Sequence, residues 1–121
     1  MADGTAEEVV LAFFAAWARL DLDAIMSFFT PDAQWENVPI GVVSGSEAIR
    51  ADVEAFLEQM SSFEVEFVNI AFNGNVVLAE RVDTVGVDDE QSFARVAGVF
   101  EIEDGKIKLW RDYFALPTDD D

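Results

Sequence analysis

The spacing of apolar residues changes near residue 62 from a helical period to a strand period, and this change limits what the chain can fold into. Before residue 62, apolar side chains recur every three or four positions, which indicates amphipathic helices. After it, apolar and polar residues alternate, which indicates strands joined by short turns. Helices followed by a meander of strands predict an α+β fold in which the helices pack against one face of a sheet.

Two helices are expected before residue 33. Thr5 and Glu8 fit a capping box at the start of the first helix. The apolar positions of this helix are Val10, Phe13, Phe14 and Trp17. Asp21 or Asp23 can cap a second, short helix, which is expected to end at residues 30–32 because a residue before proline disfavours helix. The apolar residues of this second helix are Ile25, Phe28 and Phe29.

A third helix and five strands complete the expected elements of a single domain spanning residues 1–121. Ser46 is expected to cap the helix, after a loop that contains Pro39, Gly41 and Gly45. The apolar positions of this helix are Ile49, Val53, Phe56, Leu57 and Met60. Strands are expected at residues 33–38, 62–72, 76–87, 92–101 and 107–115. The turns between the later strands are Asn73–Gly74, Asp88–Glu90 and Asp104–Gly105. Residues 116–121 are expected to form a flexible acidic tail.

Cysteine and histidine are both absent, which removes several classes of active site. Without cysteine the chain has no disulfide, thiol nucleophile or thiolate metal site. Without histidine it has no Ser–His or Cys–His pair, and zinc and non-haem iron lose their usual ligand. Acid–base chemistry would therefore fall to aspartate, glutamate, lysine or the single tyrosine, Tyr113.

The chain carries 25 acidic and 7 basic residues, which gives a net charge of −18. This charge repels phosphates, so no nucleic-acid partner is expected. A solvated acidic surface explains the composition, and adaptation to a salt-rich source is the alternative. No run of 18 uncharged apolar residues is present, and residues 1–4 lack the basic start of a secretory signal. We therefore expect a cytoplasmic protein that has no membrane partner.

Three pairs of residues two apart place polar groups inside segments that otherwise resemble strands. The pairs are Trp35/Asn37, Arg81/Asp83 and Trp110/Asp112. Because side chains two apart on a strand point to the same face, each pair shares a face, and at least three strands contribute. Charges on an inner face are costly unless they are paired, so the arrangement indicates a functional site inside a curved sheet.

Arg81, Asp83 and Asp112 can form one cluster if their strands are neighbours. A guanidinium has five N–H donors in a flat fork and can hold two carboxylates at once. One proton shared by the carboxylates would make the cluster neutral and split their titration, leaving one acid and one base at the same pH. The alternative is a buried ion-pair network without catalysis. Trp35 and Trp110 would supply apolar walls, and each also fits an ordinary core position.

Several strings of the sequence resemble the limonene-1,2-epoxide hydrolase family over nearly the whole chain. They are Asp32–Pro39 (DAQWENVP), Glu80–Asp83 (ERVD), Gly98–Ile102 (GVFEI), Gly105–Ile107 (GKI) and Trp110–Phe114 (WRDYF). The ERVD and WRDYF strings are the most specific. The resemblance implies a cone-shaped α+β fold of the nuclear-transport-factor-2-like superfamily, which includes SnoaL-like and polyketide-cyclase-like proteins. It also implies a curved mixed sheet with helices on its concave face, and a homodimer without cofactor or metal.

The same resemblance implies a role for each candidate site residue. Asp112 matches the general base that activates water, and Asp83 matches the acid that protonates the epoxide oxygen. Arg81 matches the bridging arginine, and Asn37 matches an amide that helps to hold the water. The implied reaction adds water to a small apolar epoxide in one step and yields a vicinal diol. The family's water-holding tyrosine corresponds to Trp35 here, and an indole N–H can donate but cannot accept a hydrogen bond.

Two other interpretations remain open on the sequence alone. One is a ketosteroid-isomerase-like or polyketide-cyclase-like enzyme, in which an aspartate moves a proton beside a carbonyl. The other is a non-catalytic module that binds a small apolar ligand or dimerises. Tyr113 follows Asp112 directly and is expected on the opposite face of its strand. Outward apolar positions such as Val99 and Tyr113 need cover, which a homodimer would provide.

Overall fold

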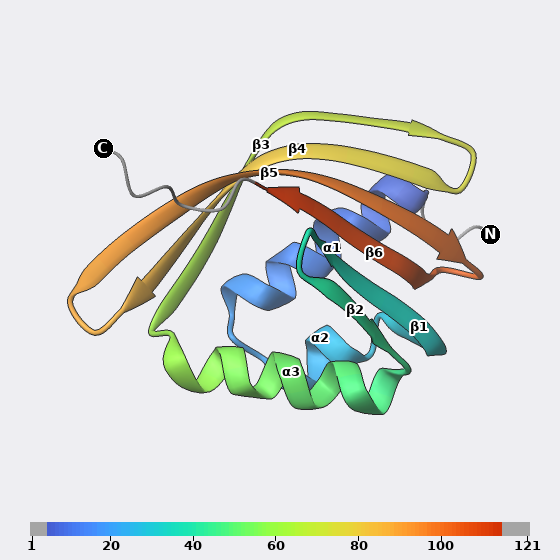
Figure 1. The fold of residues 1–121 in the computed structure, drawn as a ribbon. Coiled ribbons are helices and arrows are strands. Elements are labelled where there is room, and N and C mark those ends of the chain that lie inside the picture. Colours follow the sequence, from blue (N-terminus) through green and yellow to red (C-terminus); the bar gives the residue numbers. More distant parts are fainter. Residues whose placement is uncertain (1–4, 115–121) are drawn as a thin grey trace.

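The computed structural model describes residues 5–114 as three helices and a curved, open sheet (Figure 1). The helices are α1 (Ala6–Ala18), α2 (Leu22–Met26) and α3 (Ser46–Gln59). The strands are β1 (Phe29–Val38), β2 (Gly41–Ser44), β3 (Ser62–Asn73), β4 (Val76–Val87), β5 (Glu90–Glu103) and β6 (Lys106–Phe114). These elements confirm the α+β fold that the change in apolar period predicts. The acidic tail expected at residues 116–121 lies outside the described residues.

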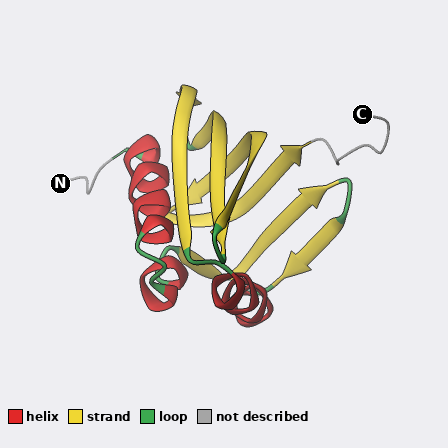
Figure 2. Cartoon of the chain, turned by 90° about the vertical axis from the view of Figure 1, so that its left-hand side faces the viewer, coloured by secondary structure: helices red, strands yellow, loops and turns green. Residues whose placement is uncertain are grey.

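The six strands form one mixed sheet in the order β2–β1–β6–β5–β4–β3. Neighbouring strands are antiparallel except for β1 and β6, which run parallel. Helix α1 packs against β3, β4 and β5, while α3 packs against β1 and β2. Figure 2 shows the strands curving around these helices. The helices therefore cover the concave face, as expected from the sequence.

Helix α1 begins where the sequence predicts, because Thr5 and Glu8 cap each other. Thr5 Oγ1 accepts a hydrogen bond from the Glu8 backbone N–H at 3.2 Å, and the Thr5 N–H donates to Glu8 Oε1 at 3.1 Å. One face of the helix then turns inward, and Phe13 on this face is fully buried. Its ring meets aromatic rings of the turn before β1, of β1 itself, of β5 and of β6: Phe28, Phe29, Phe100 and Trp110. This aromatic cluster is the core on which the inner face of the sheet rests.

The second helix ends earlier than predicted, and Phe28 and Phe29 do not belong to it. Helix α2 stops at Met26, and β1 begins at Phe29, which pairs with Ile107 of β6. The Ile107 N–H donates to the Phe28 carbonyl at 2.6 Å, so pairing with a distant strand holds this segment in the sheet. Pro31, expected to end the helix, lies in an irregular stretch of β1 where its missing N–H interrupts no regular ladder.

The loop expected after residue 38 contains a strand that the sequence analysis misses. Strand β2 pairs antiparallel with β1 over its whole length. It has only four residues, too few for alternation to be recognised. The prediction that Ser46 caps the following helix is also wrong. Gly45, with φ +91°, precedes α3 without a side-chain cap, and Ser46 is the first helical residue.

The β3–β4 turn is displaced by one residue from its predicted position. Asn73 pairs with Val76, which leaves Gly74 and Asn75 as the two turn residues. Gly74 has φ +62°, a left-handed conformation that glycine adopts without strain. The prediction of a two-residue hairpin is therefore confirmed, and only its register is wrong.

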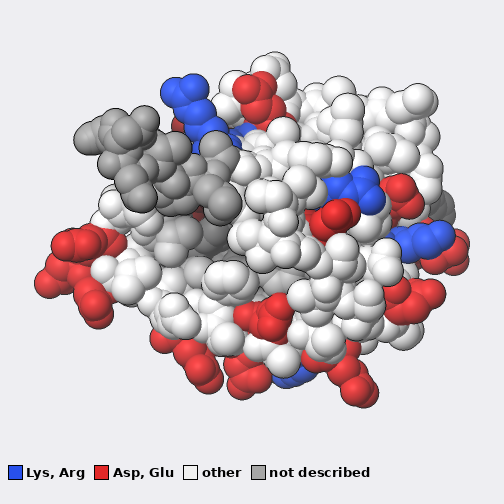
Figure 3. Space-filling view, viewed as in Figure 1, with Lys and Arg blue, Asp and Glu red and all other residues white. Residues whose placement is uncertain are grey.

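Acidic side chains are prominent on the surface of the described residues. In the view of Figure 3 they gather along α3 and at the tip of the β4–β5 hairpin, with few lysines or arginines between them. These positions are solvated, as expected for a chain of net charge −18. Within residues 5–114, none of the helices has the length and apolar character needed to cross a bilayer.

Candidate active site

Three strands carry the polar side chains singled out in the sequence onto the inner face of the sheet. Strand β1 contributes Trp35 and Asn37, β4 contributes Arg81 and Asp83, and β6 contributes Trp110 and Asp112. In the parallel β1–β6 pair, two register positions share this face: Trp35 with Trp110, and Asn37 with Asp112. The fixed alternation of side chains along a strand is sufficient to bring them to one face.

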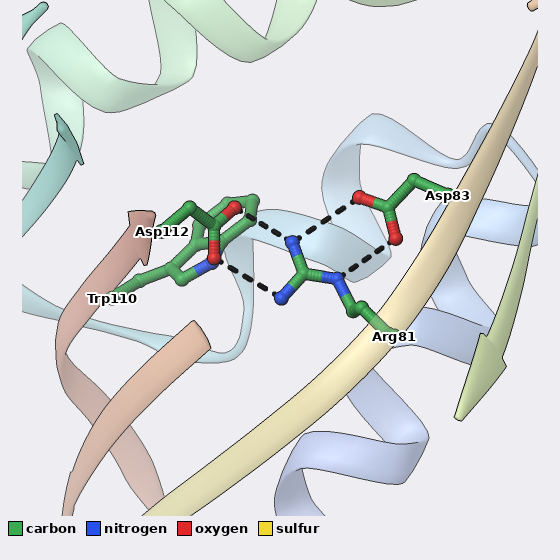
Figure 4. A network of polar contacts seen from close by, with 4 residues as sticks. All are labelled: Arg81, Asp83, Trp110 and Asp112. Atoms are coloured by element: carbon green, nitrogen blue, oxygen red, sulfur yellow. Dashed lines mark hydrogen bonds and ion pairs between the residues drawn. The ribbon is translucent and has the colours of Figure 1, made fainter. Parts of the chain in front are cut away.

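Arg81 lies at the centre of the cluster and is 1% exposed. Its Nε donates to Asp83 Oδ1 at 2.8 Å, and its Nη2 donates to Asp83 Oδ2 at 3.2 Å. On the other side, Nη1 donates to Asp112 Oδ1 at 3.1 Å and Nη2 donates to Asp112 Oδ2 at 2.6 Å (Figure 4). Four of the five N–H groups are used in this way, and both oxygens of each carboxylate are held.

The strands that carry Arg81 and Asp112 are not neighbours, although adjacent strands were the condition under which the sequence predicted the cluster. Strand β5 lies between β4 and β6, so the guanidinium has to cross it. It crosses at Gly98, where an added Cβ would lie 2.5 Å from Arg81 Nη1 and 2.9 Å from Asp112 Oδ1. Residue spacing alone does not identify Gly98 as part of the site. The available signal was a glycine inside a strand pattern, which often marks a close approach to the backbone.

Asp112 receives a further hydrogen bond from its own strand. Trp110 Nε1 donates to Asp112 Oδ1 at 2.8 Å, and this bond is buried. Figure 4 shows the indole edge directed at the carboxylate, on the side away from Asp83. The sequence places Trp110 only in the wall, although its two-residue spacing from Asp112 already puts both side chains on one face.

Burial and charge together set the protonation of the cluster. Desolvation by itself would lower the pKa of Arg81, but Asp112 and Asp83 outweigh it and raise that pKa above its ordinary value. Desolvation raises the pKa of Asp83, and the Asp112 charge adds to this while Arg81 opposes it. Asp83 therefore keeps its proton to higher pH than an exposed aspartate does. With one proton on Asp83, the three-residue cluster is neutral.

An aromatic cavity of about 160 Å³ opens directly onto the two carboxylates. It is lined by Trp17, Trp35, Phe56, Met60, Phe63, Val85 and Trp110, together with Asp83 and Asp112. A second cavity of about 250 Å³ borders the same two carboxylates and includes Asn37. The two carboxylates therefore lie between the aromatic cavity and the second cavity, which Asn37 lines.

A larger hollow lies on the opposite, outer face of the sheet, and none of the three cluster residues lines it. It measures about 470 Å³ and is lined by residues that include Glu80, Arg95 and Tyr113. We place the candidate site at the inner cavities because the buried ion pairs and the raised pKa of Asp83 are there. Within residues 5–114, no group of three or more acidic, histidine or cysteine side chains is placed to hold a metal ion.

The remaining candidate residues take different positions around the carboxylates. Trp35 stacks on Trp110 with ring centroids 4.5 Å apart and planes 5° apart, and its Nε1 has no partner within residues 5–114. Asn37 lines the second cavity beside Asp112. Tyr113 is 45% exposed and lies on the outer face, as its position after Asp112 predicts.

Comparison with known proteins gives one family and two related proteins of the same kind. Residues 5–118 match the model of the limonene-1,2-epoxide hydrolase catalytic domain. The epoxide hydrolase EphG of Mycobacterium tuberculosis is 34% identical over 105 residues, which span 87% of this chain and 70% of that protein. The structure of an M. tuberculosis LEH-like epoxide hydrolase superposes with a TM-score of 0.84 at 33% identity, covering 91% of this chain and 82% of that chain.

More distant structures share the fold alone. A hypothetical protein from Catenulispora acidiphila, described as having a ketosteroid isomerase-like fold, superposes with a TM-score of 0.80 at 21% identity. The alignment covers 90% of this chain and 86% of that chain. An NTF2-like protein of unknown function from Cytophaga hutchinsonii superposes with a TM-score of 0.75 at 21% identity, over 94% and 93% of the two chains. At this identity only the architecture is comparable.

Proposed function

The chain belongs to the limonene-1,2-epoxide hydrolase family, and on that premise we propose that it adds water to an apolar epoxide in one step, giving a vicinal diol. The observation that carries the proposal is the buried Arg81, which holds Asp83 and Asp112 together at the wall of an aromatic cavity. Two carboxylates on one cation can divide the acid and base roles if they share one proton.

Asp83 acts as the general acid in this mechanism. Its raised pKa keeps a proton available, and the carboxyl transfers that proton to the epoxide oxygen as the ring C–O bond breaks. Without this transfer the leaving group would be an alkoxide in a poorly solvated cavity. A positioned proton transfer of this kind is worth about 10²–10⁴-fold in rate.

Asp112 acts as the general base for the attacking water. The water oxygen forms the new C–O bond while one of its protons passes to Asp112, so that both oxygens end as hydroxyls of the diol. Asn37 lies on β1, where it pairs in register with Asp112 of β6, and it is the second group that holds this water. The proton then returns from Asp112 to Asp83 through solvent, which restores the starting state. Holding water and substrate together adds an entropic advantage.

The cavity favours a compact apolar substrate. Its volume of about 160 Å³ and its indole and phenyl walls suit a hydrocarbon framework around the epoxide. Trp35 stands where the family has a water-holding tyrosine, and here it stacks on Trp110 as part of the wall. We therefore propose that Asp112 and Asn37 hold the water without a phenol, and that substrate preference differs from that of family members with the tyrosine.

A panel of cyclic and linear epoxides in ¹⁸O-labelled water tests the proposal. We expect diol formation with one labelled oxygen even in a single turnover, because water attacks carbon directly. A covalent aspartyl ester would instead place an unlabelled carboxylate oxygen in the first diol. Folded protein that yields no diol above background from any epoxide contradicts the proposal.

Asp83→Asn separates catalysis from simple ligand binding. An amide cannot protonate an alkoxide, so we expect kcat to fall about 10²–10⁴-fold. Binding of an apolar epoxide analogue, measured by quenching of tryptophan fluorescence, is expected to survive. Asp89→Asn, in the exposed β4–β5 turn, removes one negative charge without touching the site and serves as the control. Unchanged hydrolysis in Asp83→Asn would favour a different acid.

The isomerase interpretation lacks a phenol in the cavity. The only tyrosine, Tyr113, lies on the outer face and cannot donate to an oxyanion inside. A non-catalytic binding module is the remaining alternative, and it predicts that the unmutated protein binds epoxides without converting them.

A further inference from the structure

We propose that Trp110 is a positioning residue that makes Oδ2 of Asp112 the atom which takes the proton from the attacking water. This inference rests on the proposed hydrolysis, because it assigns that proton to one of two carboxylate oxygens. It starts from the buried hydrogen bond of 2.8 Å that Trp110 Nε1 donates to Asp112 Oδ1 (Figure 4).

Oδ1 of Asp112 has no place left for a proton. A carboxylate oxygen offers two lone-pair sites. Trp110 Nε1 occupies one of them, and Arg81 Nη1, at 3.1 Å, occupies the other. An indole N–H cannot turn into an acceptor and a guanidinium stays charged, so neither group can adapt to a proton on Oδ1. The backbone at Gly98 closes this side further, because a Cβ there would lie 2.9 Å from Oδ1.

Oδ2 of Asp112 keeps one lone-pair site free. Within residues 5–114 it accepts a single hydrogen bond, from Arg81 Nη2 at 2.6 Å. Asp112 also borders both cavities, and Asn37 lines one of them next to it. A water held between Asn37 and Asp112 therefore finds one open acceptor on the carboxylate, and that acceptor is on Oδ2.

Trp110 is itself held in place, which a positioning residue requires. Its ring stacks against rings of the strands on either side, Trp35 of β1 at 4.5 Å and 5°, and Phe100 of β5 at 6.1 Å and 15°. Phe13 of α1 meets it edge-on at 5.0 Å. The indole cannot rotate away from Asp112 without disturbing this packed core. Its N–H direction is therefore fixed before substrate arrives.

Trp110→Phe removes the N–H and keeps an aromatic ring in the stack. Oδ1 then regains a free lone pair that faces away from the productive water, so we expect kcat to fall about 10–100-fold with KM within twofold. The carboxylate also loses a donor that favours its charged form. The acidic limb of the pH–rate profile is therefore expected to move.

Trp35→Phe is the matched comparison, because it removes an indole N–H from the same stack. This N–H has no partner within residues 5–114, so the acidic limb should stay in place whatever happens to KM. A second replacement separates the hydrogen bond from packing. With 3-benzothienylalanine in place of Trp110, sulfur replaces only the N–H, and the limb should move as it does in Trp110→Phe. An unmoved limb in this variant overturns the inference.

A measurement without substrate keeps this inference distinct from the proposed function. We expect the ¹³C chemical shift of the Asp112 carboxyl carbon, assigned with Asp112→Asn and compared at one fixed pH, to change more in Trp110→Phe than in Trp35→Phe. If it does so while no epoxide is hydrolysed, the proposed function fails and the effect of Trp110 on the carboxylate stands. If the unmutated protein forms diol and the Trp110 variants leave the acidic limb and this chemical shift unchanged, the inference alone fails.

Discussion

Residue 98 decides whether two carboxylates can share one cation. Arg81 on β4 reaches Asp112 on β6 only by lying across β5, and it does so over Gly98. Glycine weakens a strand interior, so its use here is explained by the close approach of a guanidinium and a carboxylate to the backbone. The geometry of the site thus depends on a missing side chain as much as on the charged ones.

Gly98→Ala is expected to separate Arg81 from Asp112 and to remove most of the hydrolysis. Its Cβ would overlap the guanidinium, and breaking a buried ion pair costs about 3–5 kcal/mol. Steady-state kinetics and urea unfolding measure the two effects. Gly86→Ala is the control for hydrolysis alone, because its Cβ would overlap the Ser62 hydroxyl and no group of the cluster. Wild-type activity in Gly98→Ala contradicts the argument.

The pH dependence of hydrolysis is expected to carry the signature of Asp83. Its pKa is raised above the ordinary 3.8, chiefly by desolvation, and the acid works only while protonated. Activity should therefore fall as pH rises through the raised value, and Asp83→Asn should lose this alkaline limb.

The contribution of Asp83 to the free energy of unfolding also decreases as pH rises. Because the folded state binds this proton more tightly than the unfolded chain, the stabilisation is complete below the unfolded-state pKa. It is lost as pH rises through the folded-state pKa. Urea unfolding at several pH values, with Asp83→Asn for comparison, measures this slope, and a variant with the same slope would contradict the assignment.

At the scale of residues, the sequence predicts which side chains share a face and misses how they meet. Alternation along a strand is local, so spacing alone predicts that Arg81 shares a face with Asp83 and that Trp110 shares a face with Asp112. The two predicted hairpin turns already place β5 between the strands that carry the charges, but spacing does not show that the guanidinium crosses β5 over Gly98. The Trp110 hydrogen bond depends on a side-chain rotamer, which spacing does not fix either.

At the scale of elements, α1 connects the aromatic core to the site through one face. Phe13 is fully buried and touches rings of four other segments, including Trp110. Leu11, on the same helix, is 39% exposed. The contribution of the helix to stability is therefore expected to come from the Phe13 side, and two alanine substitutions on one helix can test this.

Phe13→Ala is expected to lower the free energy of unfolding by about 3–5 kcal/mol, because a large buried ring leaves a cavity. Leu11→Ala is expected to cost about 0.5 kcal/mol or less, as is usual for exposed positions. Urea denaturation followed by circular dichroism measures both. Failure of Phe13→Ala to fold would be the same result in its extreme form, and equal costs for the two variants would contradict it.

The elements that the sequence misjudges are those decided by distant partners. Strand β2 is four residues long and exists because β1 lies beside it. Phe29 continues a helical pattern locally, yet it pairs with Ile107 far along the chain. By contrast, α1 and the Asp104–Gly105 turn are specified by residues next to one another, and both are confirmed.

At the scale of the whole molecule, the family resemblance carried by the ERVD and WRDYF strings is confirmed by the match over residues 5–118. The homodimer that the resemblance also implies stays a prediction. With a net charge of −18, two copies of this chain repel each other over most of their surfaces. A self-association surface therefore has to be a place where acidic residues are few or balanced.

The middle of the outer sheet face meets that condition. Arg111 Nε forms an ion pair there with Glu36 Oε1 at 2.6 Å. In the lining of the outer hollow, the positive charge of Arg95 offsets the negative charge of Glu80. Leu78, 52% exposed, lies in this otherwise balanced region. A second copy of the chain, related by a two-fold axis, could bury Leu78 and place side chains into the outer hollow.

We therefore expect a homodimer at micromolar concentration that forms through the outer face. Leu78→Asp adds two buried negative charges per dimer and should give a folded monomer, measured by sedimentation velocity. Glu54→Gln, on the solvent side of α3, changes charge elsewhere and should leave the dimer intact.

Ionic strength provides a second test of the dimer. Between about 0.01 and 0.15 M ionic strength the Debye length falls from about 30 to 8 Å. Because salt then screens the repulsion between two chains of net charge −18, the unmutated dimer should become tighter. An unmutated protein that sediments as a monomer at both salt concentrations contradicts the outer-face dimer and leaves the inner-face chemistry untouched.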